Sequence, residues 1–232
     1  DTVTLTHADL SQANLNSAFF LNSELSYADL RGADLRNVEF ISTTLTNADF
    51  TDALIAGAFL PHATDHGFTT AQLYSTTSYK SGDLQNIQWL GNNLTGCNFA
   101  GKDLTGGNFM SATLQNADLT NAIVTGARLS SIAGSGISSA QFYSTINYKN
   151  GNLQGINLGD NNLAGWNFAG KDFRDGSVGD STLTNTDFTN AMVTGVSFAG
   201  TTARGFTPEQ LYSTASYQSG DLHGIKLDNN DV

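Results

Sequence analysis

The chain has 232 residues, of which 39% are hydrophobic and 13% are charged, and its formal net charge is −11. An average soluble domain is about 45–50% apolar and about 25% charged, so both classes are scarce here. The single cysteine excludes a disulfide scaffold and a cysteine-based zinc site. The excess of acids argues against direct binding of nucleic-acid phosphates. No apolar stretch approaches the roughly 20 residues that a membrane-spanning helix needs, so we expect no membrane insertion.

The first block of the chain repeats every five residues. A large apolar residue stands at each fifth position, and a small one stands two positions earlier, as Ala8 does before Leu10. This period fits neither a helix nor an alternating strand. It predicts a chain that turns a corner every five residues, so that four sides close a coil and successive coils stack as parallel strands about 4.8 Å apart. The large residues are Leu5, Leu10, Leu15, Phe20, Leu25, Leu30, Leu35, Phe40, Leu45, Phe50, Ile55 and Leu60.

The same period returns after each of three interruptions. Only two residues in five then face a narrow core, where large and small side chains alternate to fill the space. This arrangement accounts for a low apolar content in an ordered protein. We expect a single solenoid, with repeat blocks at residues 3–62, 82–131, 151–200 and 220–232.

Several units also match a known motif. Ala8-Asp9-Leu10, Ala13-Asn14-Leu15 and Ala28-Asp29-Leu30 resemble the A(D/N)LXX motif of the pentapeptide-repeat family, and such units cover about three quarters of the chain. The resemblance implies the fold class, an all-β solenoid that forms a right-handed quadrilateral parallel β-helix. Short α-helical inserts are expected to interrupt it.

The interruptions recur with a constant spacing, at 63–81, 132–150 and 201–219, so that a longer super-repeat overlies the five-residue one. Each contains a Ser or Thr followed three residues later by Gln, which is a capping-box signal for the start of a helix. We predict a short helix of about two turns in each insert, after which the coil resumes at Tyr79, Tyr148 and Tyr217. Inserts of this kind resemble those of long interrupted pentapeptide arrays in some bacterial proteins, including planctomycete ones. The capping pairs are Thr69 with Gln72, Ser138 with Gln141, and Thr207 with Gln210.

The apolar side chains of the inserts must be shielded from solvent by other parts of the chain. In the coil before each insert, an outward position that is normally polar holds Leu54, Ile123 or Met192 instead. We expect each helix to lie over this residue; the alternative is an exposed apolar spot that binds a partner. The insert residues expected to make these contacts are Phe68, Leu73, Tyr74, Phe142, Tyr143, Phe206, Leu211 and Tyr212.

No constellation of residues indicates catalysis, so we expect a protein that is not an enzyme and needs no cofactor. His62 and His66 lie in a loop without further ligands nearby, and Cys97 occupies a small inward position. Clusters such as Asp160-Asn161-Asn162 suit corners and stacked asparagine ladders, with calcium binding as the alternative.

The spacing of the aspartates indicates one candidate interaction surface. Asp9, Asp29 and Asp49 are separated by four units each and should stack in one outward column. With Asp34, Arg31 and Arg36 they form the candidate interaction surface. Some members of the resembled family are acidic rods that imitate DNA and bind type II topoisomerases, which makes such an inhibitor or protector our alternative function. The arginines and the helical inserts count against it.

Lys102 and Lys171 stand at positions that should face inward, where an unpaired ammonium would be costly. We expect either a bulge that turns each lysine outward or a side chain that reaches Asp103 or Asp172. The side chain of Trp166 is also too large for the small inward position that it occupies. We therefore expect irregular backbone at residues 96–103 and 165–172.

Both ends of the chain lack a polar cap. We therefore expect either a fragment of a longer protein or end-to-end self-association. Few lysines and many Asn, Thr and Ser residues favour an extracytoplasmic location. The leading hypothesis is a non-enzymatic structural or interaction module whose partner is another protein.

Overall fold

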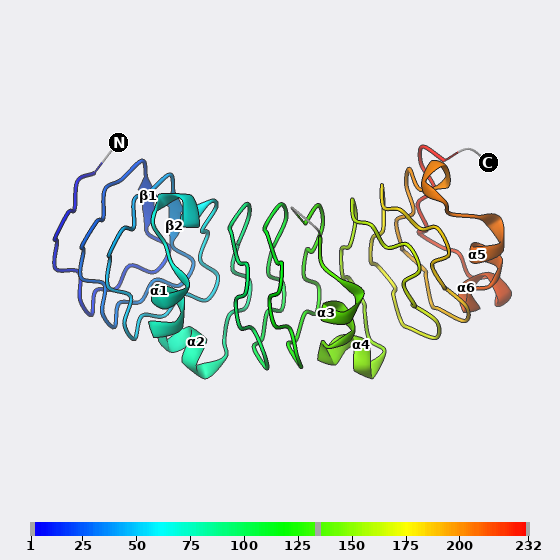
Figure 1. The fold of residues 1–232 in the computed structure, drawn as a ribbon, viewed down its shortest axis with the longest axis horizontal. Helices are drawn as coiled ribbons and strands as arrows, with labels where there is room; N and C mark the ends of the chain where they lie inside the picture. The colour runs from blue at the N-terminus through cyan, green and yellow to red at the C-terminus, as the bar shows by residue number, and fades with distance from the viewer. Residues whose placement is uncertain (1–2, 133–135, 231–232) are drawn as a thin grey trace.

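A computed structural model describes residues 3–132 and 136–230. The chain winds as a coil along one long axis, and its two ends lie at opposite ends of the molecule (Figure 1). Parallel bridges join positions four units apart, as Asp9 to Asp29, except across an insert, where Phe59 pairs with Gln88. Each turn of the coil therefore consists of four units, as the five-residue period predicts. It is a β-helical solenoid built mostly from isolated bridges.

Four rows of bridges run along the coil, one on each side of a turn, and we name the four faces by their first residues: Thr4, Asp9, Asn14 and Phe19. The strands β1 (Phe19–Leu21) and β2 (Glu39–Ile41) pair in parallel on the Phe19 face. In the described ranges, only the row on this face crosses every insert without a break. Its members are Phe19, Glu39, Phe59, Gln88, Asn108, Arg128, Asn157, Ser177, Ser197 and Lys226.

The corners explain why Asn, Asp, Ser and Gly are so frequent. At most corners one residue has a positive φ, for example Asn37 at 57° and Gly32 at 65°. Asn, Asp and Gly adopt this left-handed conformation most readily. The corner then lets the next inward N–H bond the preceding inward carbonyl, as Ala33 N–H does to Leu30 O at 3.1 Å.

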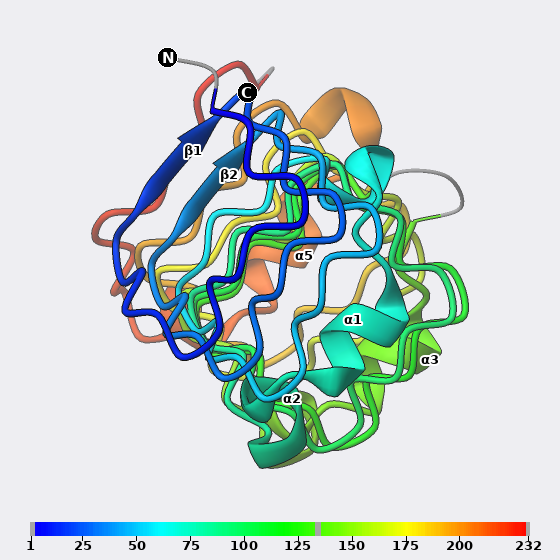
Figure 2. The same cartoon turned by 90° about the vertical axis from the view of Figure 1, so that its left-hand side faces the viewer.

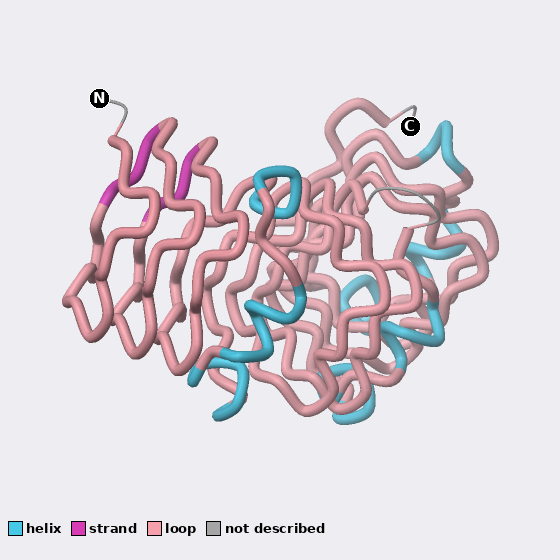
Figure 3. Tube along the Cα trace, turned by 60° about the vertical axis from the view of Figure 1, so that its left-hand side comes forward, coloured by secondary structure: helices cyan, strands magenta, loops and turns pink. Residues whose placement is uncertain are grey.

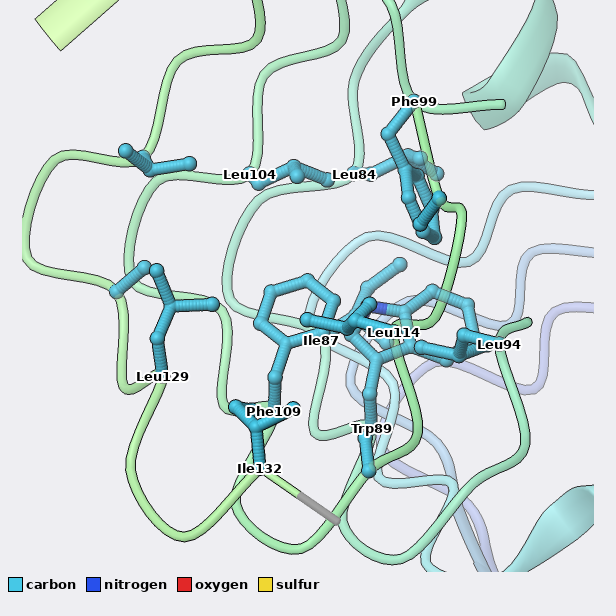
Figure 4. Packing of buried hydrophobic residues seen from close by; sticks show 14 of the residues in the cluster. Leu84, Ile87, Trp89, Leu94, Phe99, Leu104, Phe109, Leu114, Leu129 and Ile132 are labelled. Carbon is cyan, nitrogen blue, oxygen red and sulfur yellow. The ribbon is translucent and has the colours of Figure 1, made fainter. Parts of the chain in front are cut away.

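The core is a thin continuous column inside the coil. Leu84 and Leu104 lie in line on successive coils, and the aromatic rings of Trp89, Phe99 and Phe109 gather around the axis (Figure 4). All five side chains are at most 1% exposed. Two inward residues per unit thus suffice to build a continuous buried core.

Each insert carries two short helices. The first begins at the predicted capping box, and in all three inserts both hydrogen bonds of the box are present. The second was not predicted, and it contains Tyr79, Tyr148 or Tyr217, so the prediction that the coil resumes at these residues was wrong. The helices are α1 (Thr70–Ser75), α2 (Thr77–Ser81), α3 (Ser139–Tyr143), α4 (Ile146–Asn150), α5 (Pro208–Tyr212) and α6 (Ala215–Gln218), and two 3-10 helices are η1 (Ala63–His66) and η2 (Thr202–Arg204).

The helices and the regular strands occupy opposite sides of the solenoid. Viewed from its N-terminal end, α1 and α3 lie across the coil from β1 and β2 (Figure 2). The tube in Figure 3 shows the helical segments entering the coil where bridged turns would otherwise continue. Within the described ranges, no helix combines the length and the apolar character needed to cross a membrane.

The first helices do not cover the outward apolar residues, contrary to expectation. Ile123 is 36% exposed and Met192 is 39% exposed, while Leu54 is half-buried. Instead, the helices turn their apolar side chains into the core: Leu73 is 1% exposed and Phe142 is fully buried. Each helix replaces part of the coil wall, so its apolar residues continue the core from within.

The backbone around both lysines is regular, so the expected bulge was wrong. Lys102 N–H bonds Phe99 O at 3.0 Å, as in ordinary units. The Lys102 ammonium lies 4.3 Å from the centroid of the Tyr79 ring, and Lys171 lies at the same distance from Tyr148. The lysine side chains thus leave the core for an aromatic ring of the preceding insert and not for the neighbouring aspartates.

The backbone at Trp166 is regular as well, which corrects the same expectation for this residue. Its N–H bonds Leu163 O at 3.0 Å. The indole is buried beside α3, with ring centroids 5.5 Å from Phe142 and 5.9 Å from Tyr143. The helical wall at this point accommodates the large side chain without a change in the coil.

Candidate functional site

The helical inserts interrupt three faces of the coil, and side chains bridge the gaps. On the Asp9 face the capping glutamine has a second role. Gln72 Nε2 donates to Leu45 O at 2.9 Å and to Ala48 O at 2.8 Å. Gln141 and Gln210 make the same two bonds to their preceding coils. The bond to Ala48 O replaces the one that a following strand would make, as Asp49 N–H makes to Ala28 O, whereas Leu45 O also accepts the N–H of Ala48 within its corner.

Two tyrosines continue the ladder on the other side of the first and second helix pairs. Tyr74 Oη accepts the backbone N–H of Asn98, and Tyr79 Oη donates to Asn98 O, both at 2.8 Å. Their rings stack with centroids 4.4 Å apart. Tyr143 and Tyr148 hold Asn167 in the same way. The hydroxyl pair therefore replaces a C=O and an N–H of the preceding strand, the groups that Ala8 and Leu10 supply to Asp29.

Side-chain oxygens close the gap on the Asn14 face. Asn147 Oδ1 accepts the N–H of Val124 at 2.7 Å, and Ser216 Oγ accepts the N–H of Val193 at 2.9 Å. Asn147 is 6% exposed and Ser216 is 5% exposed. Each acceptor comes from the second helix of its insert, which explains why that helix lies against the coil.

An asparagine secures the start of each insert on the Thr4 face, and it is buried at the first two inserts. Asn92 Nδ2 donates to Leu60 O at 2.6 Å, and its Oδ1 accepts the N–H of Thr64 at 2.9 Å. Asn161 and Asn230 make the corresponding contacts at the second and third inserts. These residues act singly at the inserts and do not form the stacked ladder that the sequence suggested.

The candidate interaction surface is a patch of ion pairs. Asp9 bridges to Asp29 and Asp29 to Asp49, so the acids do stack. Arg31 Nε donates to Asp29 at 2.8 Å and lies 3.8 Å from Asp49, and its hydrogen bond lowers the pKa of Asp29. The column ends at α1, which occupies the next position on this face.

Arg36 and Asp34, the neighbouring pair of the patch, form a similarly short ion pair. Arg36 Nε and Nη2 donate to Asp34 at 2.8 and 2.6 Å, and the hydrogen bond lowers the pKa of Asp34 to about 2. Both side chains remain partly exposed. The two arginines thus pair with three of the four acids of the patch, which therefore presents no uniform negative field.

Sequence reasoning missed a second surface, on the Phe19 face. The residues that follow the inward position there are apolar and half-buried over five successive coils. Phe19 itself is 57% exposed. The sequence signal was present as an apolar residue directly after the periodic one. This apolar strip consists of Leu21, Ile41, Pro61, Leu90 and Met110.

The family model described as pentapeptide repeats (8 copies) matches the chain over residues 5–40, 33–64 and 93–130. This match agrees with the bridged coil of four five-residue units per turn described above. Over these residues the chain belongs to the pentapeptide-repeat family. No curated protein matches it in sequence.

Solved pentapeptide-repeat structures show a likeness at low identity. Full-length QnrB1, a plasmid-mediated fluoroquinolone resistance protein, is 15% identical over 99% of this chain and 93% of its own, with a TM-score of 0.27. HetL, from the cyanobacterium Nostoc and involved in heterocyst differentiation regulation, is 19% identical over 99% and 83%, with a TM-score of 0.21. Rfr23 from the cyanobacterium Cyanothece is 22% identical over 70% and 97%, with a TM-score of 0.24.

The reactive residues of this pentapeptide-repeat chain lie apart from one another. Burial raises the pKa of the Cys97 thiol to about 11, which makes it a poor nucleophile at neutral pH. His62 Nδ1 lies 3.4 Å from Asp65, while His223 Nδ1 pairs with Asp221. In the part of the chain that the structure describes, no three His, Cys, Asp or Glu residues are grouped as metal ligands.

Proposed function

We propose that this pentapeptide-repeat protein is a non-enzymatic interaction rod and that a protein partner binds its Phe19 face. The observation that carries the proposal is the uninterrupted ladder from Phe19 to Lys226, with the apolar strip beside it. The other three faces are broken by helices at each insert. A continuous surface with partly exposed apolar side chains suits binding to a folded protein.

The density of charge favours this role over imitation of DNA. Nine bridge steps along the Phe19 row, at about 4.8 Å each, make the rod about 43 Å long. Duplex DNA of that length carries about 25 phosphate charges. The chain has a net charge of −11, and three acids of its candidate patch, Asp29, Asp34 and Asp49, are paired with arginines. The proposal of a topoisomerase inhibitor or protector therefore stands second.

Further parts of the proposal rest on family resemblance and composition. The resemblance supports a right-handed coil of four sides, which an experimental structure would show directly. Scarce lysine together with abundant Asn, Thr and Ser supports a location outside the cytoplasm.

The binding surface can be tested by charge placed on the apolar strip. Ile41→Glu with Leu90→Glu should abolish capture and cross-linking of the protein that the unmodified chain retains. Ser177→Glu with Ser197→Glu adds the same charge to the same face, beyond the strip, and should leave binding intact. Loss of the partner with Asp29→Asn and Arg31→Gln alone would move the site to the charged patch.

A supercoiling assay with a bacterial type II topoisomerase separates the two functions. We expect no inhibition and no protection by the unmodified chain. Inhibition that persists in the strip variant and disappears with the acid-patch variant would support the DNA-mimic alternative and overturn our proposal.

A further inference from the structure

On the Asn14 face, the second helix of each insert supplies one acceptor to the coil, but the residue differs between inserts. It is asparagine in the second insert and serine in the third. Asn147 also acts as a donor, since its Nδ2 donates to Thr125 Oγ1 at 2.9 Å and to Asn152 O at 3.3 Å. A planar NH₂ group therefore lies between the helix and the coil in the second insert.

In the third insert the same two acceptors have no such donor. Thr194 and Asp221 stand at the positions of Thr125 and Asn152, one super-repeat later. Ser216 Oγ accepts the N–H of Val193 but offers no NH₂ group. Within the described ranges, the Thr194 hydroxyl and the Asp221 carbonyl have no hydrogen-bond partner, although Thr194 is only 8% exposed. Serine in place of asparagine leaves them so.

This difference does not depend on the coils beyond the insert. In a regular coil, the carbonyl at the position of Asp221 accepts from the preceding coil, as Asp103 O accepts the N–H of Leu84 at 3.0 Å. The first insert shows the same arrangement with further coils on both sides. Ser78 stands there in place of the asparagine, and the Asp83 carbonyl accepts no hydrogen bond within the described ranges.

A groove of about 320 Å³ lies at this place in the third insert. Thr194, Ser216 and Asp221 line it, together with Arg174 and Met192. Met192 is one of the outward apolar residues that no helix covers, and it is 39% exposed. The groove thus combines two acceptors, a carboxylate and an apolar wall.

The charges around the groove favour a cation. Arg174 is paired with Asp172, to which its Nε and Nη2 donate at 2.8 and 2.7 Å. The carboxylate of Asp221 is left, with His223 Nδ1 at 2.8 Å, and the hydrogen bond from His223 lowers the pKa of Asp221. This carboxylate is therefore charged at neutral pH.

The residues around the groove change together with the residue on the helix. Where the helix has serine, an arginine and an aspartate line the groove, as Arg36 and Asp83 do in the first insert. Where the helix has Asn147, the corresponding residues are Thr105 and Asn152. The copy that holds an amide is neutral, whereas the two copies with serine carry charge.

We propose that the groove of the third insert binds the guanidinium of an arginine side chain from a partner protein. A guanidinium has planar NH₂ groups like that of Asn147, so it can donate to Thr194 Oγ1 and to Asp221 O. Its charge pairs with the Asp221 carboxylate, and its methylene stem packs against Met192. The site lies on the Asn14 face, apart from the apolar strip, and so goes beyond the function proposed above. The first insert has Ala56 in place of Thr194, lacks one acceptor and binds more weakly.

Capped amino acids serve as probes, and the chemical shifts of the backbone amides report where they bind. N-acetyl-arginine amide should shift the signals of Thr194 and Asp221. N-acetyl-citrulline amide keeps the planar NH₂ group without the charge, and it should bind about fivefold more weakly. N-acetyl-lysine amide keeps the charge without the planar group and should also bind more weakly than the arginine probe. Free arginine should bind no tighter than the capped form, because the groove holds only the side chain.

Ser216→Asn recreates the arrangement of the second insert and should close the groove. Its amide should donate to Thr194 Oγ1 and Asp221 O, so the affinity for the arginine probe should fall at least about tenfold. Ser197→Asn places the same side chain on the Phe19 face and should leave binding unchanged. Circular dichroism checks that both variants keep the fold.

The reciprocal change should create a site in the second insert. Asn147→Ser keeps an acceptor for the N–H of Val124, as Ser216 does for Val193, and Asn152→Asp adds the carboxylate. The double variant should show a new response to the arginine probe at Thr125, which the unmodified chain lacks.

Several outcomes would overturn the proposal. The arginine probe might leave the signals of Thr194 and Asp221 unshifted at every accessible concentration, or bind Ser216→Asn as well as it binds the unmodified chain. Equal or tighter binding of the citrulline probe would rule out a cation, and tighter binding of the lysine probe would rule out a guanidinium. Tighter binding of free arginine would identify the amino acid itself as the ligand, in place of a side chain from a partner protein.

Discussion

The hydroxyl oxygen of Ser78 accepts the backbone N–H of Ile55 at 3.0 Å, at a point where the ladder of the Asn14 face is broken. A carbonyl of the next coil would fill this role in an uninterrupted array. Both residues are buried, at 2% and 1% exposed. The helical insert is therefore compatible with the solenoid because a side chain replaces a backbone acceptor.

Ser78→Ala removes that acceptor and leaves the Ile55 N–H buried without a partner. Such a group costs about 1–3 kcal/mol, so the free energy of unfolding in urea should fall by that amount. Ser81→Ala in the same helix removes an ordinary bond within the helix. The control should stay within about 0.5 kcal/mol of the unmodified chain. Equal losses for both variants would show that Ser78 acts only through the helix.

Gln141→Glu separates the capping role from the bond to the coil. Glutamate serves a capping box as well as glutamine does, but it cannot donate to Leu114 O and Ala117 O. We expect a loss of about 2 kcal/mol in unfolding free energy. Gln115→Glu adds the same charge at an exposed position of the coil. A loss no larger than in this control would contradict the second role of the glutamine.

The tyrosine pairs predict a loss of stability at high pH. Burial raises the pKa of Tyr79 to about 12 and that of Tyr148 to about 12, from an ordinary value of 10.0. Because the folded state holds these protons more tightly, their contribution is complete below about pH 10 and is lost between about pH 10 and 12. Phenolate absorbance should show two late-titrating tyrosines, and unfolding midpoints should fall over the same range. Replacing both by Phe should flatten the fall, whereas Tyr27→Phe, at a site 52% exposed, should not.

Lys171→Met tests the contact between the ammonium and the Tyr148 ring. The substitution keeps the length of the side chain but removes the charge and the hydrogen bond from Nζ to Tyr148 O at 3.1 Å, and the ring contact alone should account for a loss of about 0.5–1 kcal/mol. Lys171→Arg should retain most of the stability because the guanidinium also stacks on aromatic rings. Lys149→Met, which breaks an exposed bond to Asn121, is the control for loss of a surface cation. A smaller loss for Lys171→Met than for this control would exclude the aromatic contact as a stabilising one.

The sequence predicted some structural elements of the fold better than others. The coil followed from Leu5 to Leu60 and their small partners, and the starts of α1, α3 and α5 followed from their capping boxes. The second helices were missed because residues such as Tyr79 stand five before the next leucine and so match the coil period. The inward lysines were correctly flagged as anomalies, but their aromatic partners lie in the preceding insert, more than a full turn of the coil away in sequence.

For the candidate surfaces, too, some features were predictable from the sequence and others were not. The stacking of Asp9, Asp29 and Asp49 was predictable from their even spacing of four units, and it is observed. Their pairing with Arg31 depends on side-chain geometry within one coil. The apolar strip was visible in the sequence but had no apparent meaning until one face proved free of helices.

The sequence by itself determined the five-residue coil, its thin core and the places where helices begin, because these depend on local periodicity and local capping. Only the tertiary structure decided how coil and helix join. A break in a backbone ladder is repaired by whichever donor or acceptor reaches it in space. Here these are the hydroxyls of Tyr143 and Tyr148, the amide of Gln141 and the carbonyl oxygen of the Asn147 side chain. Their partners lie 19 to 27 residues away in sequence, so no local pattern shows which atoms will meet.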